Sequence, residues 1–374
     1  MKHAVNKLTI KGFKSIKHME NFTLENLNVL IGGNGAGKSN FIDFFRLLRA
    51  MMESSLPGLH NVNLQSFIKD GGGIHDFLFN GPKITKEIQC ELLLGKIGYQ
   101  FKLSPTADER VIIYDEKTYN KNINDCWKYI GGGYDVSNLL KNKDVNPEND
   151  QHKDAAHIYD TIQSCYIYHF NDSSKNAAMR HFEIIEDYDY LRFDAANIAP
   201  FLLRLREKSI ASYKDIIETI RLVIPFFDDF IFKESKNEKV RLNWKQKGSD
   251  YPMRPHLFSD GSMRFICLAA ALLQPYPPTT MIIDEPELGM HPYAIEILAE
   301  LIDAASQKSQ VIISTQSSNL VDYFKPENII VAFRDNGASI FSRLNATELL
   351  HWMDEYSLGE LWRKNIISGV PVHE

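Results

Sequence analysis

One stretch near the N-terminus decides how this chain folds: Gly32-Gly33-Asn34-Gly35-Ala36-Gly37-Lys38-Ser39. It matches G-x-x-x-x-G-K-[S/T] and lies between an apolar run at 26–31, which predicts a strand, and a helical spacing of apolar residues at 40–52. In such a turn the glycines let successive backbone N–H groups face an anion, and the helix N-terminus adds a positive dipole end. The stretch therefore predicts a phosphate-binding loop rather than a glycine-rich turn that binds nothing. Lys38 is expected at the β and γ phosphates of a nucleotide, and Ser39 at Mg²⁺.

A second apolar run, Met281-Ile282-Ile283, ends in two acids, Asp284 and Glu285. In folds built on a phosphate-binding loop, the strand-end aspartate lies beside the Mg²⁺ ion. The next residue, Glu285, is then placed to act as a general base for water. The alternative is that two acids merely end a strand in solvent, and the presence of the loop argues against it.

The composition indicates a globular protein of two to three domains, or one large α/β domain with insertions. The 374 residues are 44% hydrophobic and 24% charged, and a chain of this length buries a sizeable core without disulfides. The formal net charge of -6 does not indicate nucleic-acid binding, so any such site must be a local basic patch.

The cysteines and the apolar runs indicate in which cellular compartment the protein lies. The four cysteines form no C-x-x-C pair, which argues against a zinc knuckle and favours reduced thiols in the cytoplasm. The N-terminus carries no apolar segment of a secretory signal. The longest apolar run, 265–273, is far shorter than the roughly 20 residues that span a bilayer. We expect a cytoplasmic protein without a membrane partner.

Hydrophobic periodicity along the chain predicts an α/β fold with a mostly parallel sheet. Buried strands are expected at 8–13, 26–31, 163–170, 279–284, 310–314 and 328–333. Helices are expected at 40–52, 197–223, 262–273 and 292–306. Alternating strands at 86–115 predict an antiparallel β-layer, and the polar stretch 117–155 is expected to be a loop or an insertion. We divide the chain into the segments 1–115, 116–250 (an insertion or helical subdomain) and 251–374.

The segment Phe258-Ser259-Asp260-Gly261-Ser262, just before the third predicted helix, carries a family resemblance. It resembles the signature loop of ABC-type ATPases, although that family has a glycine in place of Asp260 and a glutamine in place of Ser262. The order cradle, signature, acidic strand and switch is also that of the family. The stretch from Asp284 to Pro292 resembles the acidic strand and D-loop of the SMC, RecF and OLD branch. Phe13-Lys14-Ser15 resembles the N-terminal strand motif of the same branch.

The resemblance implies a P-loop NTPase with an ABC-type head that hydrolyses ATP with Mg²⁺. It also implies an ATP-sandwich dimer, in which the signature loop of one copy closes over nucleotide held by the other. The catalytic candidates are Glu285, Lys38 and Gln316. The implied nucleotide-binding residues are Lys14, Ser15, Gly32, Gly33, Asn34, Gly35, Ala36, Gly37, Lys38, Ser39, Asn40, Ser259, Asp260 and Gly261. The implied metal-site residues are Ser39, Asp284 and Gln65.

Three of these assignments have a structural alternative. Ser259 is also suited to cap the helix that follows it. Gln316 stands where ABC ATPases usually have a histidine; it either meets the nucleotide or only ends a strand. A glutamine has no proton that titrates near neutral pH, so slow turnover and a weak pH dependence near about 6.5 are expected. Gln65 is either a Q-loop residue or a surface glutamine.

The rest of the chain indicates a compact ATPase that works with partners. The stretch between the phosphate-binding loop and the signature segment lacks heptads, so no coiled-coil arm is expected. Only a short stretch follows Gln316, which leaves little room for a nuclease domain. The resemblance is to ATPases of prokaryotic defence or DNA-repair operons, and it implies a separately encoded nuclease or effector.

Two basic patches are candidates to contact duplex DNA, and the alternative for both is a solvated strand face. The first patch is Lys2, Lys7, Lys11, Lys14 and Lys17. The second surrounds Trp244 and consists of Lys233, Lys236, Lys239, Arg241, Lys245, Lys247 and Arg254. Three other functions stay open. They are an ATP-gated scaffold that barely hydrolyses, the nucleotide-binding subunit of a transporter, and an ATPase that acts on RNA or translation factors.

Overall fold

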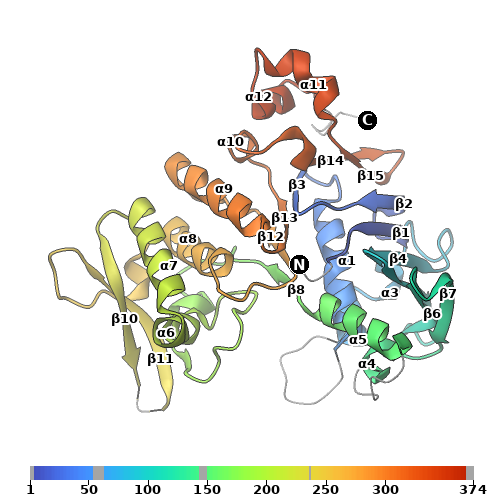
Figure 1. The fold of residues 1–374 in the computed structure, drawn as a ribbon, viewed down its shortest axis with the longest axis horizontal. Coiled ribbons are helices and arrows are strands. Elements are labelled where there is room, and N and C mark those ends of the chain that lie inside the picture. Colours follow the sequence, from blue (N-terminus) through green and yellow to red (C-terminus); the bar gives the residue numbers. More distant parts are fainter. Residues whose placement is uncertain (1–3, 54–62, 143–149, 236, 368–374) are drawn as a thin grey trace. The chain divides into compact units, whose positions relative to one another are not determined.

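The computed structural model of the chain describes residues 4–53, 63–142, 150–235 and 237–367. By contacts between residues, the chain forms two compact units (Figure 1). The first comprises Met1–Tyr166, Glu327–Asn345 and Lys364–Glu374, and the second comprises Ile167–Pro326 and Ala346–Arg363. The units are thus interleaved along the sequence.

The first unit contains an antiparallel sheet with the strand order β2-β1-β4-β5-β6-β7 (Figure 1). Its strands are β1 Lys7–Phe13, β2 Ile16–Thr23, β4 Ile88–Leu94, β5 Ile97–Pro105, β6 Val111–Asn120 and β7 Asn124–Gly131. Alternate side chains of β4 are buried, namely Ile88, Cys90, Leu92 and Leu94, as expected for a sheet with one face on the core. The antiparallel β-layer expected at 86–115 is confirmed.

The loop expected at 117–155 is wrong for the described part of that stretch. β6 and β7 run into it, and α4 Asn138–Asn142 and α5 Asp150–Gln163 follow; residues 143–149 lie outside the described residues. A buried carboxylate organises this region. Glu116 accepts hydrogen bonds from Tyr99 Oη, from Ser137 Oγ at 2.6 Å and from the Asn138 backbone N–H at 2.8 Å. In the described part of this stretch, asparagines such as Asn120 in β6 and Asn138 in α4 therefore belong to regular secondary structure.

A parallel strand pair and one long helix hold the phosphate-binding loop in the first unit. β3 Leu27–Ile31 is buried throughout, and it pairs in parallel with β14 Ile329–Asp335. β14 turns back into β15 Ala338–Arg343, which forms an antiparallel hairpin with it (Figure 1). Helix α1 Lys38–Met51 starts where the loop ends. The short helices α2 Leu64–Asp70 and α3 Ile74–Phe77 complete this unit.

The second unit contains the acidic strand. β12 Thr280–Asp284 pairs in parallel with β13 Gln310–Ser314, and both are almost fully buried. Two long helices accompany them, α8 Asp260–Leu272 and α9 Pro292–Ser306. Pro292 is the first residue of α9, where a proline loses no hydrogen bond because that N–H has no partner within the helix.

The second unit also contains a three-stranded antiparallel sheet that the sequence did not predict. Its order is β10-β11-β9, with β9 Glu183–Ile184, β10 Phe227–Glu234 and β11 Lys239–Gln246. Helices α6 Ile198–Lys208 and α7 Ile210–Val223 account for the helical stretch expected at 197–223, and Tyr213 of α7 packs against Phe232 of β10. Buried residues do not alternate cleanly in these strands, since Leu242, Asn243 and Trp244 of β11 are buried in succession, so the pattern typical of a strand is weak in the sequence.

The remaining elements are short. They are β8 Cys165–Tyr168, α10 Ser318–Val321, α11 Ala346–Met353 and α12 Leu358–Arg363. Every helix in the described ranges is too short or too polar to serve as a membrane span.

Candidate nucleotide-binding site

The phosphate-binding loop joins β3 to α1 and requires glycine at both ends. Gly32 has φ 149°, and a Cβ there would lie 2.2 Å from the Ala332 carbonyl oxygen. Gly37 has φ 107°, and a Cβ there would lie 2.1 Å from Ser339 Oγ. Neither the backbone conformation nor the available space admits a side chain at these positions. The loop is therefore packed tightly against the β14–β15 hairpin.

Lys38 places its charge inside the loop. Its Nζ donates hydrogen bonds to the carbonyl oxygens of Gly32 at 2.6 Å and Gly33 at 3.1 Å, and the residue is only 7% exposed. Asn34 and Ser39 are exposed at the loop and the first turn of α1. An anion at this surface would meet a buried ammonium and the N-terminus of a helix 14 residues long.

Ser15 and Asn40 support the loop from behind. Asn40 Nδ2 donates to Ser15 Oγ at 2.6 Å, and Ser15 Oγ lies 2.7 Å from Ser339 Oγ. Ser15 and Ser339 are both buried. Ser339 was not predicted, because its part in the site depends on a strand pairing that no local motif reveals.

Lys14 and Gln65 bind protein groups in this structure. Lys14 Nζ lies 2.6 Å from Asp43 Oδ2 on α1 and 4.5 Å from the centre of the Phe77 ring. Gln65 donates from Nε2 to the Val111 carbonyl oxygen at 2.6 Å and accepts from the Val111 N–H at 3.3 Å. Both the amide nitrogen and the amide oxygen of Gln65 thus bind the β6 backbone. This favours a structural role for Gln65 over a role as a Q-loop residue.

The acidic pair, Asp284 and Glu285, lies at the C-terminal end of β12 in the second unit. Ser314 Oγ donates to Asp284 Oδ1, and these two residues face each other in the β12–β13 register. His169 Nδ1 lies 4.0 Å from Asp284 Oδ2. Asp284 therefore has one oxygen oriented by a serine, and its side chain is 17% exposed.

Glu285 occupies a strained backbone position next to Gln316. Its φ is 46°, in the left-handed region that non-glycine residues seldom adopt, and its N–H donates to the Ser314 carbonyl oxygen at 2.8 Å. Gln316 Nε2 donates a hydrogen bond to Glu285 Oε1. The structure thus joins two of the predicted catalytic residues, one after β12 and the other after β13.

Glu287 is a third acid of this segment, and the sequence analysis assigned it no role. Thr315 Oγ1 donates to its Oε1 at 2.6 Å, while its Oε2 is buried without a hydrogen-bond partner. Burial raises the pKa of the Glu287 carboxyl above its ordinary value. The signal was present in the sequence, since Glu287 lies in the same acidic segment as Asp284.

The signature segment begins α8 and is held by a buried arginine. Ser259 is the N-cap, and its Oγ accepts from the Ser262 N–H at 3.2 Å. Arg180, which is 5% exposed, donates to Asp260 Oδ1 at 2.9 Å and to the carbonyl oxygens of Pro255 and Phe258. The aspartate at position 260 is thus paired with Arg180, which also holds the loop before the helix.

The signature helix lies directly against the segment that follows the acidic pair. A Cβ on Gly261 would lie 2.2 Å from the Gly289 carbonyl oxygen, so the two backbones touch. Arg264 of α8 donates to the Leu288 carbonyl oxygen and to that of Phe170 at 2.9 Å. Arg264 is 4% exposed, and one arginine inside the apolar run 262–273 is a signal that could have identified it.

In both basic patches some lysines pair with acidic side chains, which reduces the positive charge available to DNA. Lys11 lies 3.5 Å from Glu20, and Lys14 pairs with Asp43, while Lys2 lies outside the described residues. In the second patch, Lys245 lies 2.7 Å from Asp228. Trp244 is 2% exposed and stacks on Phe258 with 4.4 Å between ring centres, so it cannot stack on a nucleic-acid base; Lys236 also lies outside the described residues.

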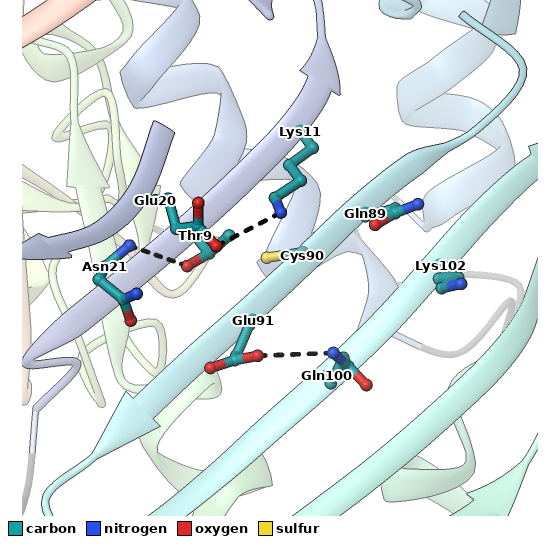
Figure 2. Close-up of a pocket in the computed structure, with 9 residues that line it drawn as sticks. All are labelled: Thr9, Lys11, Glu20, Asn21, Gln89, Cys90, Glu91, Gln100 and Lys102. Carbon is teal, nitrogen blue, oxygen red and sulfur yellow. Dashed lines mark hydrogen bonds and ion pairs between the residues drawn. The ribbon is translucent and has the colours of Figure 1, made fainter. Parts of the chain in front are cut away.

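A small polar pocket of about 90 Å³ lies on the β-layer of the first unit (Figure 2). Figure 2 shows Lys11 directed toward Glu20 and Gln100 directed toward Glu91 across neighbouring strands. Its lining carries two lysines and two glutamates, so it presents no net positive charge to a phosphate. None of the residues predicted to bind the nucleotide or the metal lines it, whereas Lys11 of the first basic patch does.

Comparisons with known proteins agree with this geometry. The family described as "AAA domain, putative AbiEii toxin, Type IV TA system" matches residues 27–322. A Helicobacter pylori (strain ATCC 700392 / 26695) protein named "ATP/GTP phosphatase" is 22% identical over 339 residues, which is 85% of this chain and 86% of that protein.

Among solved structures, an SMC head bound to the C-winged helix domain of ScpA matches with a TM-score of 0.56 at 17% identity. The match covers 93% of this chain and 99% of that one, which shows that the two share a fold. The predicted α/β P-loop fold with an ABC-type head is confirmed. The chain belongs to the AbiEii-type AAA-domain family and is an arm-less P-loop ATPase with the fold of an SMC head.

Proposed function

We propose that this chain binds Mg-ATP at the phosphate-binding loop, hydrolyses it, and signals through an ATP-dependent dimer to DNA or to a separate nuclease or effector. The observation that carries the proposal is the placement of Lys38 Nζ inside a loop that requires glycine at positions 32 and 37. A buried ammonium beside a helix N-terminus is suited to a polyphosphate, because both contribute positive potential at the same place. The name of the Helicobacter relative supports a nucleoside triphosphate as the ligand.

The residues present fit a magnesium ion. Mg²⁺ prefers oxygen ligands; the first unit offers the exposed hydroxyl of Ser39, and the second unit offers the partly exposed carboxylate of Asp284, whose other oxygen is oriented by Ser314. When bound, Mg²⁺ neutralises charge on the phosphates. Gln65 is left out of this proposal because its amide binds the β6 backbone.

Hydrolysis needs a base that takes a proton from water, and we assign that role to Glu285. Its strained backbone and the hydrogen bond from Gln316 hold the carboxylate in one orientation, which a base requires. Gln316 is the switch in this proposal. Its amide can hydrogen-bond either the carboxylate or a phosphate oxygen, so it can report the presence of a ligand to Glu285.

The second copy of the chain would contribute Ser259 and Gly261. Ser259 caps α8 with an exposed hydroxyl, and Gly261 brings the start of that helix against the backbone of Gly289. An exposed helix N-terminus of this kind suits the terminal phosphate of a nucleotide held by another copy. ATP would then hold the dimer together, and hydrolysis would release it.

We propose that the dimer works in the cytoplasm and that its signal serves defence or DNA repair. The family description names a toxin of a toxin–antitoxin system, and the SMC head was solved with a partner protein domain; both favour a protein effector. Several of the basic side chains proposed to contact duplex DNA are paired with acids, which reduces the positive charge that they offer to phosphates.

Steady-state ATP turnover with and without duplex DNA tests the function, with Glu285→Gln as the blank. We expect turnover that the variant lacks. A further increase with DNA would assign DNA as the trigger, and turnover indifferent to DNA would assign a protein partner. If Lys38→Ala bound ATP as tightly as the wild type, the assigned loop would be wrong.

One observation favours a second candidate, an ATP-gated scaffold with little hydrolysis. The Gln316 amide occupies Glu285 Oε1, and while it does so that oxygen is not available to take a proton from water. Single-turnover kinetics separate the two candidates. The scaffold binds ATP and forms the dimer, but it releases phosphate no faster than Glu285→Gln.

A further inference from the structure

The β14–β15 hairpin follows the phosphate-binding loop along its whole length. The Ala332 carbonyl oxygen packs against Gly32, and Ser339 Oγ packs against Gly37. Between these two contacts, Arg334 Nε donates a hydrogen bond to the Gly35 carbonyl oxygen at 3.1 Å. These contacts join residues that lie about three hundred positions apart in the chain. They fix the hairpin at the start, the middle and the end of the phosphate-binding loop.

Arg334 is the one cationic side chain among these contacts. It faces Ser339 in the β14–β15 register, and residues opposite each other in a sheet project from the same face. Ser339 reaches Ser15 behind the loop, so Arg334 projects toward the loop as well. Its Nε binds Gly35 and its Nη1 binds the Gly337 carbonyl oxygen, which together hold the guanidinium beside the middle of the loop.

Among the described residues, no acidic side chain pairs with the charge of Arg334. Residues 334 and 35 are both exposed, and no carboxylate in the described part of the chain forms an ion pair with this guanidinium. The side chain also has donors on Nη2 that neither of its two carbonyl contacts uses. A cation that is held in place, exposed and without a counter-charge lies beside a loop whose ligand is a polyanion.

We propose that Arg334 is a further nucleotide-binding residue, which adds a second fixed positive charge to that of Lys38 and contacts the polyphosphate of the nucleotide. The inference rests on the proposed function and extends its site to the β14–β15 hairpin. Arginine suits this task, because its planar fork binds phosphate oxygens while it keeps its hydrogen bond to the loop.

The test compares the ATP dissociation constants of the wild type, Arg334→Lys and Arg334→Gln, measured by calorimetry at low and at moderate salt. Glutamine can keep a hydrogen bond to Gly35 without the charge, whereas lysine keeps the charge. We expect Arg334→Gln to bind ATP about 3- to 10-fold more weakly and with a shallower salt dependence, and Arg334→Lys, which keeps the charge but not the planar fork, to lose clearly less affinity than Arg334→Gln.

Arg110→Gln is the matched control. It removes the same charge from an exposed arginine of the same unit, one that pairs with Asp135 at 3.0 Å, and it should leave ATP affinity unchanged. Equal affinity of Arg334→Gln and the wild type would overturn the inference. So would a loss in Arg334→Lys as large as that in Arg334→Gln, which would mean that hydrogen-bond geometry rather than charge matters. A wild type that binds no ATP would instead overturn the proposed function, and this inference with it.

Discussion

Gln316 and Glu285 are joined by a hydrogen bond from the glutamine Nε2 to the glutamate Oε1, across 31 positions of sequence. Each follows one of two neighbouring parallel strands, and the carboxyl ends of such strands meet at one edge of the sheet. The candidate base and the candidate switch are therefore directly joined by this hydrogen bond.

Glu285→Gln should lower ATP hydrolysis by about 10²- to 10⁴-fold while ATP binding persists, because the amide cannot accept the proton from water. The variant should accumulate as an ATP-bound dimer. Single-turnover phosphate release and size-exclusion chromatography with ATP measure the two effects. Residual hydrolysis near the wild-type rate would remove Glu285 from the mechanism.

Gln316→His should introduce a pH dependence that the wild type lacks. An imidazolium beside Glu285 would pair with the carboxylate and weaken it as a base, so turnover should fall as pH drops below about 6.5. Turnover of both proteins between about pH 5.5 and 8.5 checks this, since an unperturbed histidine titrates within that range. If the wild type showed the same fall, a different group would control its rate.

Lys38→Ala should weaken ATP binding by about 10- to 100-fold, as expected for the loss of charged hydrogen bonds to phosphate. Calorimetric titration with ATP measures this effect. Thermal unfolding provides the control, because Lys38 is buried and its loss leaves the Gly32 carbonyl oxygen without that donor. Unchanged affinity in a folded variant would contradict the assignment of the loop.

Gly261→Ala should destabilise the protein by about 1–3 kcal/mol, as overpacking does. Alanine is the better helix former, so the loss would come from the collision of its Cβ with the Gly289 carbonyl oxygen, 2.2 Å away. Urea unfolding measures the effect. Ser262→Ala, one residue further along the helix, keeps the N–H that binds Ser259 and should be nearly neutral.

Glu287→Gln should gain stability relative to the wild type as pH rises from acid toward neutral. Burial raises the pKa of Glu287 in the folded protein, so its contribution to stability is present below the unfolded pKa and is lost as pH rises through the folded pKa. Glutamine keeps an acceptor for Thr315 Oγ1 and does not titrate. The difference in unfolding free energy between the two proteins, measured across this range, should grow with pH. A constant difference would show that Glu287 does not titrate there.

The sequence by itself determined the elements that local patterns encode. The glycine loop with its flanking strand and helix, the acidic strand at 280–284 and the helix that begins at Pro292 all lie where the sequence predicted them. Their signals are short-range, because hydrophobic periodicity, glycine conformation and proline at a helix start depend on a few neighbouring residues.

Only the tertiary structure decided which residues meet. Ser339 and Arg334 reach the phosphate-binding loop because β14 pairs with β3, and Arg180 reaches Asp260 across 80 positions. Buried polar groups need partners, and the partner can come from any distance along the chain once the strands are paired. The same reason explains why 117–155 is not the expected loop in its described part. Polar composition indicates exposure, and it does not exclude strands or helices. The elements there are stabilised by contacts such as those of the buried Glu116 carboxylate, which no local pattern encodes.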